Sequence, residues 1–307
     1  MSRALVFSEY GPPEVLRVVG VDAPHARPGR VRVRVRAAGV QPFDCDLRAG
    51  RTASFAPARF PQRLGTDFAG VIDEVGEGVE GFAVGDEVLG YRNALGTHAE
   101  HVVVPTTRIV PVPAGMSLEQ AGVLAASAQT ALTALDVLGV SSGDVLLLHG
   151  AGGGVGTYAG QIARARGATV IGTASPGRHH ALRSLGTTPV AYGDGLVDRV
   201  TALAGPAGVS VALDCVGSAE ATKASLALVA DRTRIGTIAD QAAAEQHGFV
   251  SIGTVRTPEQ LLRLVDLYVA GRLRIDIDSR YPWHQAALAH RRVESGHVRG
   301  KVVLTLD

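Results

Sequence analysis

The sequence predicts an α/β protein of two domains, one of them β-rich and the other built on a doubly wound parallel sheet. The length of 307 residues gives room for two hydrophobic cores. In the first third of the chain, short apolar strands lie between closely spaced glycines and prolines, which is typical of a compact barrel-like domain. From Ser117 onward strands and helices alternate, and this alternation predicts parallel strands with helices on both faces.

The composition narrows the class of protein. An apolar share of 46% with 38 glycines is typical of a soluble α/β enzyme, and no apolar run is long enough for a membrane span. The N-terminus lacks the apolar core of a signal peptide, and a net charge of +1 gives no electrostatic reason to expect nucleic-acid or membrane binding. The two cysteines, Cys45 and Cys215, are too few for a disulfide framework or a four-cysteine zinc site. We therefore expect a cytoplasmic protein.

In the first third, residues 31–36 alternate valine and arginine, so we expect the valines to face a core and the arginines to face water. An arginine stripe can also bind phosphate or nucleic acid, but the absence of interleaved aromatic residues favours a solvated strand face. The other strands expected in this part are residues 3–8, 15–21, 68–75, 86–90 and 98–104.

The second part begins with a helix. Ser117 and Gln120 form a capping box, and the alanine-rich segment that follows predicts a helix to about Gly139. Strands are then expected at 145–149, 168–173, 189–191, 209–214, 233–238 and 249–252. Helices are expected at 155–166, 179–185, 196–204, 219–230 and 258–271. Residues 273–277 and 302–306 are again strand-like, and we expect this tail to pair with the N-terminal domain.

A glycine-rich turn follows the first strand of the alternating part. Residues 150–156 read GAGGGVG, with a strand before them and a helix after them. Such a turn allows a phosphate to approach the unpaired N–H groups of the helix N-terminus. The strict GxGxxG pattern is not met, because the nearest match, residues 151–156, has Ala151 in place of the first glycine. The alternative interpretation of the segment is a plain tight turn.

The order of motifs along the chain resembles the zinc-independent quinone oxidoreductase branch of the medium-chain dehydrogenase/reductase superfamily. The matching segments are GVQPFD at 39–44, GTDFAGVIDEVG at 65–76, FAVGDEV at 82–88, GTHAE at 96–100 and GHVRGKVVL at 296–304. The resemblance covers essentially the whole chain. It implies a GroES-like substrate domain formed by 1–118 and 256–307, and a Rossmann dinucleotide-binding domain formed by 119–255.

The resemblance also bears on zinc. Related zinc dehydrogenases hold the metal with cysteine, histidine–glutamate and cysteine at three separated places, where this chain has Gln41, Thr66–Asp67 and the small-residue run 124–127. These are not a thiolate and imidazole ligand set, so we expect no metal site. His98 and His101 lie at strand spacing on opposite faces, which favours structural roles for both.

The cofactor expected is NADPH. A site specific for NAD places an acidic residue at the end of the second strand, where this chain has Ala174 and Ser175. Ser175, Arg178 and Tyr192 match the family residues that surround a 2′-phosphate, and arginine can form two hydrogen bonds to phosphate. The alternative is that Arg178 only begins a solvated helix.

Further cofactor contacts follow from the resemblance alone. It places the cofactor against Gln41, Thr130, Gly153, Gly154, Val155, Val216, Ile238, Ala239, Ser251, Gly253 and Lys301. Several of these follow the carboxyl ends of predicted parallel strands, where ligands of doubly wound sheets bind. Cys215 is expected to pack as a small apolar residue.

We expect hydride transfer from NADPH to a quinone or a conjugated enone, substrates that carry their own electron sink and need no metal. Gln41 is the candidate donor to the substrate carbonyl, although it can equally be a turn residue that caps backbone. Asp44 and Tyr91 can relay a proton or be purely structural. The rival activities are enoyl-thioester or other enone reduction, and NADPH binding with little catalysis. The resemblance implies a homodimer through the sheet edge near 249–253.

Overall fold

The computed structural model describes residues 1–306, which form two compact units. Of the described residues, the first contains 1–126, 257–262 and 275–306, and the second contains 127–256 and 263–274. Residues 119–126, which the sequence placed in the dinucleotide-binding domain, group with the first unit because the helix at their start packs on its sheet. Residues 256 and 263–274, which the sequence placed in the GroES-like domain, group with the second unit. In the part of the chain that is described, no helix has both the length and the hydropathy that crossing a membrane requires.

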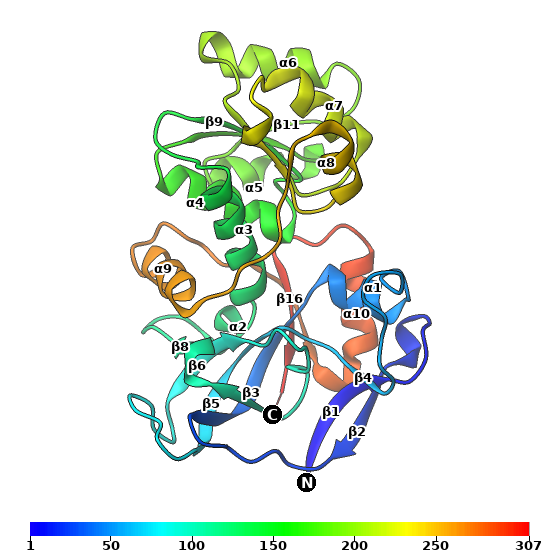
Figure 1. Cartoon of the computed structure of the whole chain (residues 1–307), viewed down its shortest axis with the longest axis vertical. Helices are drawn as coiled ribbons and strands as arrows, with labels where there is room; N and C mark the ends of the chain where they lie inside the picture. Colours follow the sequence, from blue (N-terminus) through cyan, green and yellow to red (C-terminus); the bar gives the residue numbers. More distant parts are fainter. Residues whose placement is uncertain (307) are drawn as a thin grey trace. The chain divides into compact units, whose positions relative to one another are not determined.

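The first unit is built on two sheets (Figure 1). Its larger sheet has the order β15-β16-β3-β5-β6-β8, with β7 paired to β3, and its smaller sheet has the order β2-β1-β4. The strands are β1 (Ser2–Phe7), β2 (Arg17–Val21), β3 (Arg30–Val40), β4 (Gln62–Arg63), β5 (Asp67–Val75), β6 (Glu87–Tyr91), β7 (His101–Pro105), β8 (Ile109–Pro111), β15 (Ile277–Pro282) and β16 (Lys301–Thr305). The C-terminal strand β16 pairs antiparallel with β3, which confirms the predicted return of the tail.

The alternating segment forms the centre of β3 as predicted. Val31, Val33 and Val35 are fully buried in the core of the unit, whereas Arg34 is exposed. A strand with period two therefore puts its apolar face against the core and its arginines on the other face. On that face only part of the prediction holds, because Arg32 is largely covered and pairs with Asp73 and Glu74.

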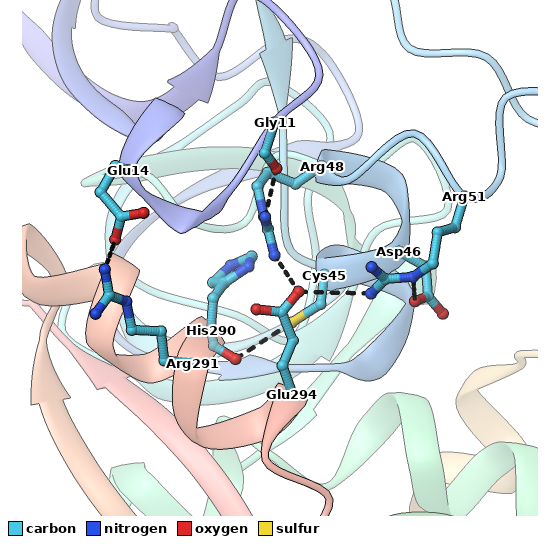
Figure 2. A network of polar contacts seen from close by, with 9 residues as sticks. All are labelled: Gly11, Glu14, Cys45, Asp46, Arg48, Arg51, His290, Arg291 and Glu294. Atoms are coloured by element: carbon cyan, nitrogen blue, oxygen red, sulfur yellow. Dashed lines mark hydrogen bonds and ion pairs between the residues drawn. The ribbon is translucent and has the colours of Figure 1, made fainter.

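Helix α1 (Pro42–Arg48) lies against α10 (Ala286–Glu294), and a network of polar contacts joins them (Figure 2). The Arg48 guanidinium is buried, pairs with Glu294 and donates to the Gly11 carbonyl. The Cys45 thiol donates to the His290 carbonyl, with Sγ 3.8 Å from the oxygen. We call these residues the Arg48 cluster. Neither α1 nor α10 was predicted from the sequence.

The second unit contains a six-stranded sheet whose order is β11-β10-β9-β12-β13-β14 and whose pairs are all parallel. Numbered from its first strand this order is 3-2-1-4-5-6, the order of a dinucleotide-binding Rossmann sheet. The strands are β9 (Val145–His149), β10 (Thr169–Thr173), β11 (Thr188–Val190), β12 (Val211–Asp214), β13 (Ile235–Thr237) and β14 (Val250–Ser251). The prediction of a doubly wound parallel sheet is confirmed.

Helices pack against this sheet. They are α4 (Gly154–Ala165), α5 (His179–Ser184), α6 (Leu196–Ala204), α7 (Ala219–Leu228) and α8 (Gln241–His247). The chain also forms α2 (Leu118–Ala121), α3 (Ala125–Val137) and α9 (Pro258–Val269). In the core of the second unit, Leu147, Ile171 and Ala212 from three neighbouring strands are buried.

Two predicted elements differ in the structure. The single helix expected from Ser117 to about Gly139 is interrupted at residues 122–124, between α2 and α3. At this break Gly122 lies so close to β3 that a Cβ there would be 2.7 Å from the Ala37 carbonyl oxygen. The strand expected at 273–277 begins only at its last residue, where Ile277 starts β15 and pairs with Lys301 of β16. Before it, the backbone N–H and C=O of Arg274 bond to the side chain of Gln161 on α4 instead of to a strand.

Candidate functional site

The first group of predicted site residues lies within the first unit. Gln41 is the N-cap of α1, Asp44 lies in the first turn of that helix, and Lys301 begins β16. Lys301 Nζ donates to Gln41 Oε1 at 2.7 Å, and Gln41 Nε2 donates to Asp67 Oδ2 at 3.2 Å. We call Gln41, Asp44, Asp67 and Lys301 the Gln41 cluster. All four side chains are buried, with exposures of 8% or less.

Asp44 holds the backbone of this cluster. Its Oδ2 accepts the backbone N–H of Gln41 at 2.8 Å, and its Oδ1 accepts the backbone N–H of Gly65 at 2.9 Å. An acidic side chain in the first turn also suits the positive end of the helix dipole. Asp44 therefore fixes both Gln41 and the segment that leads into Asp67.

Lys301 reaches the cluster because of the turn before it. Gly300 has φ +111°, and a Cβ there would lie 2.3 Å from the Asp276 carbonyl oxygen, so only glycine fits.

Burial lowers the pKa of Lys301 to about 8, although the carboxylates of Asp67 and Asp44 act in the opposite direction. The cluster thus contains an ammonium that titrates close to neutral pH.

Tyr91 lies at the end of β6 and is the register partner of Asp67 on β5. Directly opposed residues in an antiparallel pair point to the same face, so the Tyr91 side chain lies next to the cluster. The structure thus brings together all three predicted catalytic residues, Gln41, Asp44 and Tyr91. Asp67 was not predicted to be a site residue. Its position in the sequence, where related zinc dehydrogenases have a metal ligand, could have indicated it.

The second group of predicted site residues lies in the second unit, at the carboxyl edge of its parallel sheet. Gly153 is the N-cap of α4, and Gly154 and Val155 form the first turn of that helix. A Cβ on Gly156 would lie 2.2 Å from the Gly150 carbonyl oxygen, so this glycine allows the helix to approach the turn. The imperfect glycine pattern therefore still builds a strand–turn–helix unit with a free helix N-terminus.

Ala174, Ser175 and Arg178 follow β10 and lie next to the glycine turn. Arg178 Nη2 donates to the Gly152 carbonyl oxygen at 2.6 Å, which brings the guanidinium to the turn. Tyr192 follows β11, and its side chain is 60% exposed. No carboxylate occupies the end of β10, where the sequence is Thr-Ala-Ser.

Backbone loops at the other strand ends are held by two buried side chains. Asp214 Oδ1 accepts the backbone N–H of Val216 at 2.8 Å, and its Oδ2 accepts the Thr237 hydroxyl at 3.0 Å. The Thr237 hydroxyl in turn accepts the backbone N–H of Ala239 at 3.0 Å. Asp214 and Thr237 thereby fix the loops that carry three predicted contacts, Val216, Ile238 and Ala239. Neither Asp214 nor Thr237 was predicted from the sequence to be part of the site.

The remaining predicted contacts lie on α3, on β14 and in the loop after it. Thr130 on α3 hydrogen-bonds to the hydroxyl of Thr254, with 3.0 Å between the oxygens, and Thr133 donates to the Val255 carbonyl. Ser251 is in β14 and Gly253 follows it. Helix α3 therefore anchors the loop after β14.

The histidines and cysteines have structural surroundings. His98 Nε2 lies 3.0 Å from the Gly39 carbonyl oxygen, and His101 contacts Ser2 and Asp73. Burial raises the pKa of both the Cys45 and the Cys215 thiol. Within residues 1–306, no group of three or more histidine, cysteine, aspartate or glutamate side chains has an arrangement that could hold a metal ion.

Comparison with known proteins agrees with this architecture. Residues 27–114 match the alcohol dehydrogenase GroES-like domain, and residues 185–304 match a family described as zinc-binding dehydrogenase. The quinone oxidoreductase of Pseudomonas aeruginosa is 30% identical over 99% of this chain and 99% of its own length. The quinone oxidoreductase of Rattus norvegicus is 30% identical over 100% of this chain and 98% of its own.

The polyketide synthase system protein NorB of Streptomyces orinoci is 34% identical over 91% of this chain, which spans only 13% of that protein. Among solved structures, the Escherichia coli quinone oxidoreductase complexed with NADPH has a TM-score of 0.87 and 26% identity, with full coverage of both chains. Full-length similarity at this level, with both domains in place, establishes the family. The chain belongs to the quinone oxidoreductase branch of the medium-chain dehydrogenase/reductase superfamily and is an oxidoreductase.

Proposed function

We propose that this chain is an NADPH-dependent reductase that transfers hydride to a quinone or a conjugated enone without zinc. The observation that carries the proposal is the placement of Arg178 on the glycine turn beside a strand end without a carboxylate. A cofactor 2′-phosphate there would meet a guanidinium and no repelling charge. The likeness to a quinone oxidoreductase structure that contains NADPH supports the same choice.

The residues present fit a dinucleotide. The N-terminus of α4 offers unpaired N–H groups to the pyrophosphate, and Ser175 and Tyr192 stand on the neighbouring strand ends toward the 2′-phosphate. Val216, Ile238, Ala239, Thr130, Ser251 and Gly253 would face the nicotinamide half. When bound, NADPH supplies the hydride.

The donor set of the first unit favours chemistry without zinc. The positions that correspond to zinc ligands carry an amide and a carboxylate, Gln41 and Asp67, and these already bond to each other and to Lys301. A quinone accepts hydride at one end of its conjugated system and needs one proton to become the hydroquinone. Gln41 donates to the carbonyl oxygen where negative charge develops.

The second candidate is reduction of an enoyl thioester, which the 34% identity to a polyketide synthase protein favours. It uses the same hydride donor and differs only in the acceptor.

We further propose that two copies pair through β14, because this strand is the sheet edge and leaves backbone groups open on one side. Size-exclusion chromatography with light scattering measures the molar mass in solution and so shows whether two copies associate.

The test is consumption of NADPH, with NADH in parallel, against quinones, conjugated enones and enoyl thioesters. We expect turnover with NADPH and at least one acceptor, unaffected by EDTA. Replacing Arg178 by Gln should raise KM for NADPH about 10-fold and leave KM for NADH unchanged, because only NADPH carries the extra phosphate. An equal change for both cofactors, or a preference for NADH in the unaltered chain, would contradict the cofactor assignment. Cofactor binding with no turnover on any acceptor would contradict the reductase.

A further inference from the structure

The loop between β11 and α6 consists of residues 191–195, with the sequence AYGDG, and we call it the Tyr192 loop. Its two glycines, Gly193 and Gly195, have φ values of +98° and +75°, in the left-handed region. Glycine loses more conformational freedom on folding than any other residue. A segment of five residues with two glycines therefore keeps one shape only if other parts of the molecule hold it.

Two charged side chains from different helices hold the Tyr192 loop by its backbone. Arg199 on α6 donates from Nη2 to the carbonyl oxygens of Ala191 and Gly193, at 2.9 Å each. Its Nη1 donates to the Asp194 carbonyl oxygen. Glu220, in the first turn of α7, accepts the backbone N–H of Gly193 at 2.7 Å. The loop is thus bonded to a guanidinium on one side and a carboxylate on the other, and charge-assisted hydrogen bonds of this kind are stronger than neutral ones.

The Tyr192 side chain depends on this backbone for its position. It is 60% exposed, so burial in a core does not fix it. The residues on either side of it are the ones whose backbone Arg199 and Glu220 bond. The parallel pairing of Thr173 with Val190 also puts the loop at the strand edge that carries Ser175. Holding the loop therefore decides where the phenol lies along that edge.

We propose that Arg199 and Glu220 are positioning residues for cofactor specificity, which hold the Tyr192 loop so that its phenol meets the 2′-phosphate of NADPH. This inference rests on the proposed function, in which Tyr192 is one of the residues around that phosphate. A loop that already has its bound shape loses less conformational entropy when the cofactor binds. Because NADH lacks the 2′-phosphate, its affinity should depend on the loop much less.

The charge of Glu220 separates positioning from a direct electrostatic effect. If the carboxylate acted on the 2′-phosphate directly it would repel it, and its removal would tighten NADPH binding. If it acts by holding the Gly193 N–H, its removal weakens NADPH binding. The two roles therefore predict changes of opposite sign. For Arg199 both roles predict weaker binding, but Arg199→Lys keeps the charge and loses the planar fork that bonds several carbonyls at once.

Calorimetric titration of each variant with NADPH and with NADH tests the proposal. Glu220→Ala, Arg199→Met and Arg199→Lys should each raise Kd for NADPH about 3- to 10-fold, the effect of about one hydrogen bond, and Kd for NADH less than about 2-fold. Glu220→Gln should keep most of the NADPH affinity, because its amide oxygen still accepts an N–H. Unchanged or tighter NADPH binding in Glu220→Ala would overturn the proposal.

A double-mutant cycle tests the link to the phenol. In a Tyr192→Phe background, Glu220→Ala should raise Kd for NADPH less than about 2-fold, because the hydroxyl that the loop positions is gone. Effects that multiply independently would contradict the positioning role. Asp198 provides the control, since it is an exposed carboxylate in the first turn of the helix that carries Arg199. Asp198→Ala should leave both dissociation constants unchanged.

Hydrogen exchange without cofactor tests the loop itself. The Gly193 N–H should exchange faster in Glu220→Ala than in the unaltered chain, and Glu220→Gln should restore its protection. Equal exchange rates in the three proteins would overturn the positioning role. Thermal unfolding is measured for every variant, and if Arg199→Met does not fold, the Glu220 variants carry the test. A failure of the proposed function shows differently, as tighter binding of NADH than of NADPH by the unaltered chain.

Discussion

The two ends of helix α1 carry two buried polar clusters of different kinds. At its N-terminus, the Gln41 cluster combines an amide, two carboxylates and an ammonium whose pKa is about 8. At its C-terminus, the Arg48 cluster combines a guanidinium, the Glu294 carboxylate, a thiol and an imidazole (Figure 2). The same seven-residue helix therefore joins a group that can exchange a proton near neutral pH to groups that cannot.

The Arg48 cluster is chemically inert at neutral pH. Burial, together with the nearby His98 and Arg48 side chains, lowers the pKa of His290 to about 3, so its ring stays neutral. Burial raises the pKa of the Cys45 thiol, which stays protonated. The comparison teaches that buried charge alone does not indicate a reactive site. What distinguishes the Gln41 cluster is an ionisable group, Lys301, held against the amide that we propose as the donor to the substrate.

The largest expected effect comes from breaking the Arg48 cluster. Arg48→Met removes the buried cation that pairs with Glu294 and donates to the Gly11 carbonyl, and it leaves Glu294 with only the exposed Arg51 guanidinium at 3.5 Å. We expect the free energy of unfolding to fall by about 3 kcal/mol. Urea denaturation measures this loss. The kcat per folded molecule should stay close to that of the unaltered chain. A large drop in kcat at unchanged stability would mean that the two ends of α1 are not distinct in function.

A medium effect is expected from the buried imidazole. Because the pKa of His290 is lower in the folded than in the unfolded chain, its contribution to stability is complete above pH 6.5 and is lost as the pH falls toward 3. Relative to pH 7.5, this residue should cost about 2 kcal/mol of stability at pH 5. Within residues 1–306 neither ring nitrogen has a hydrogen-bond partner, so His290→Met should remove this acid sensitivity without losing a bond. Equal acid sensitivity of the two proteins would contradict the prediction.

The smallest effect should come from Arg51, which lies next to the Arg48 cluster and contacts its Glu294 at 3.5 Å. Arg51 pairs more closely with Asp46, at 2.6 Å, and both of these side chains are exposed to solvent. Arg51→Gln should change the free energy of unfolding by no more than about 0.5 kcal/mol, since water screens such pairs. This variant is the matched control for Arg48→Met in the same denaturation series. A loss as large as that of Arg48→Met would show that burial does not set the difference.

Much of this architecture was predictable because it depends on local pattern. The alternation of residues 31–36 predicted β3. The strand–turn–helix pattern at 145–166 predicted β9 and α4 of the parallel sheet. The order of the short motifs along the chain predicted the family. Each of these patterns depends only on residues that are close to one another in the sequence.

Contacts between distant residues were not predictable. In the Gln41 cluster, Gln41 bonds to Lys301, 260 positions away, and Arg48 pairs with Glu294 at a similar separation. The strand expected at 273–277 begins only at Ile277 for the same reason, because the partner of Arg274 is a side chain on α4. The periodicity of apolar residues predicts which face of a segment is buried, but it does not predict which distant residue packs against that face.

The pH dependence of kcat in the unaltered chain and in Asp67→Asn tests the account most directly. We predict that kcat of the unaltered chain with NADPH and a quinone declines above about pH 8, as Lys301 loses its proton. In Asp67→Asn the decline should begin at lower pH, because the carboxylate that stabilises the ammonium is gone. An alkaline limb at the same pH in both proteins, or none in either, would contradict the central role given to the Gln41 cluster.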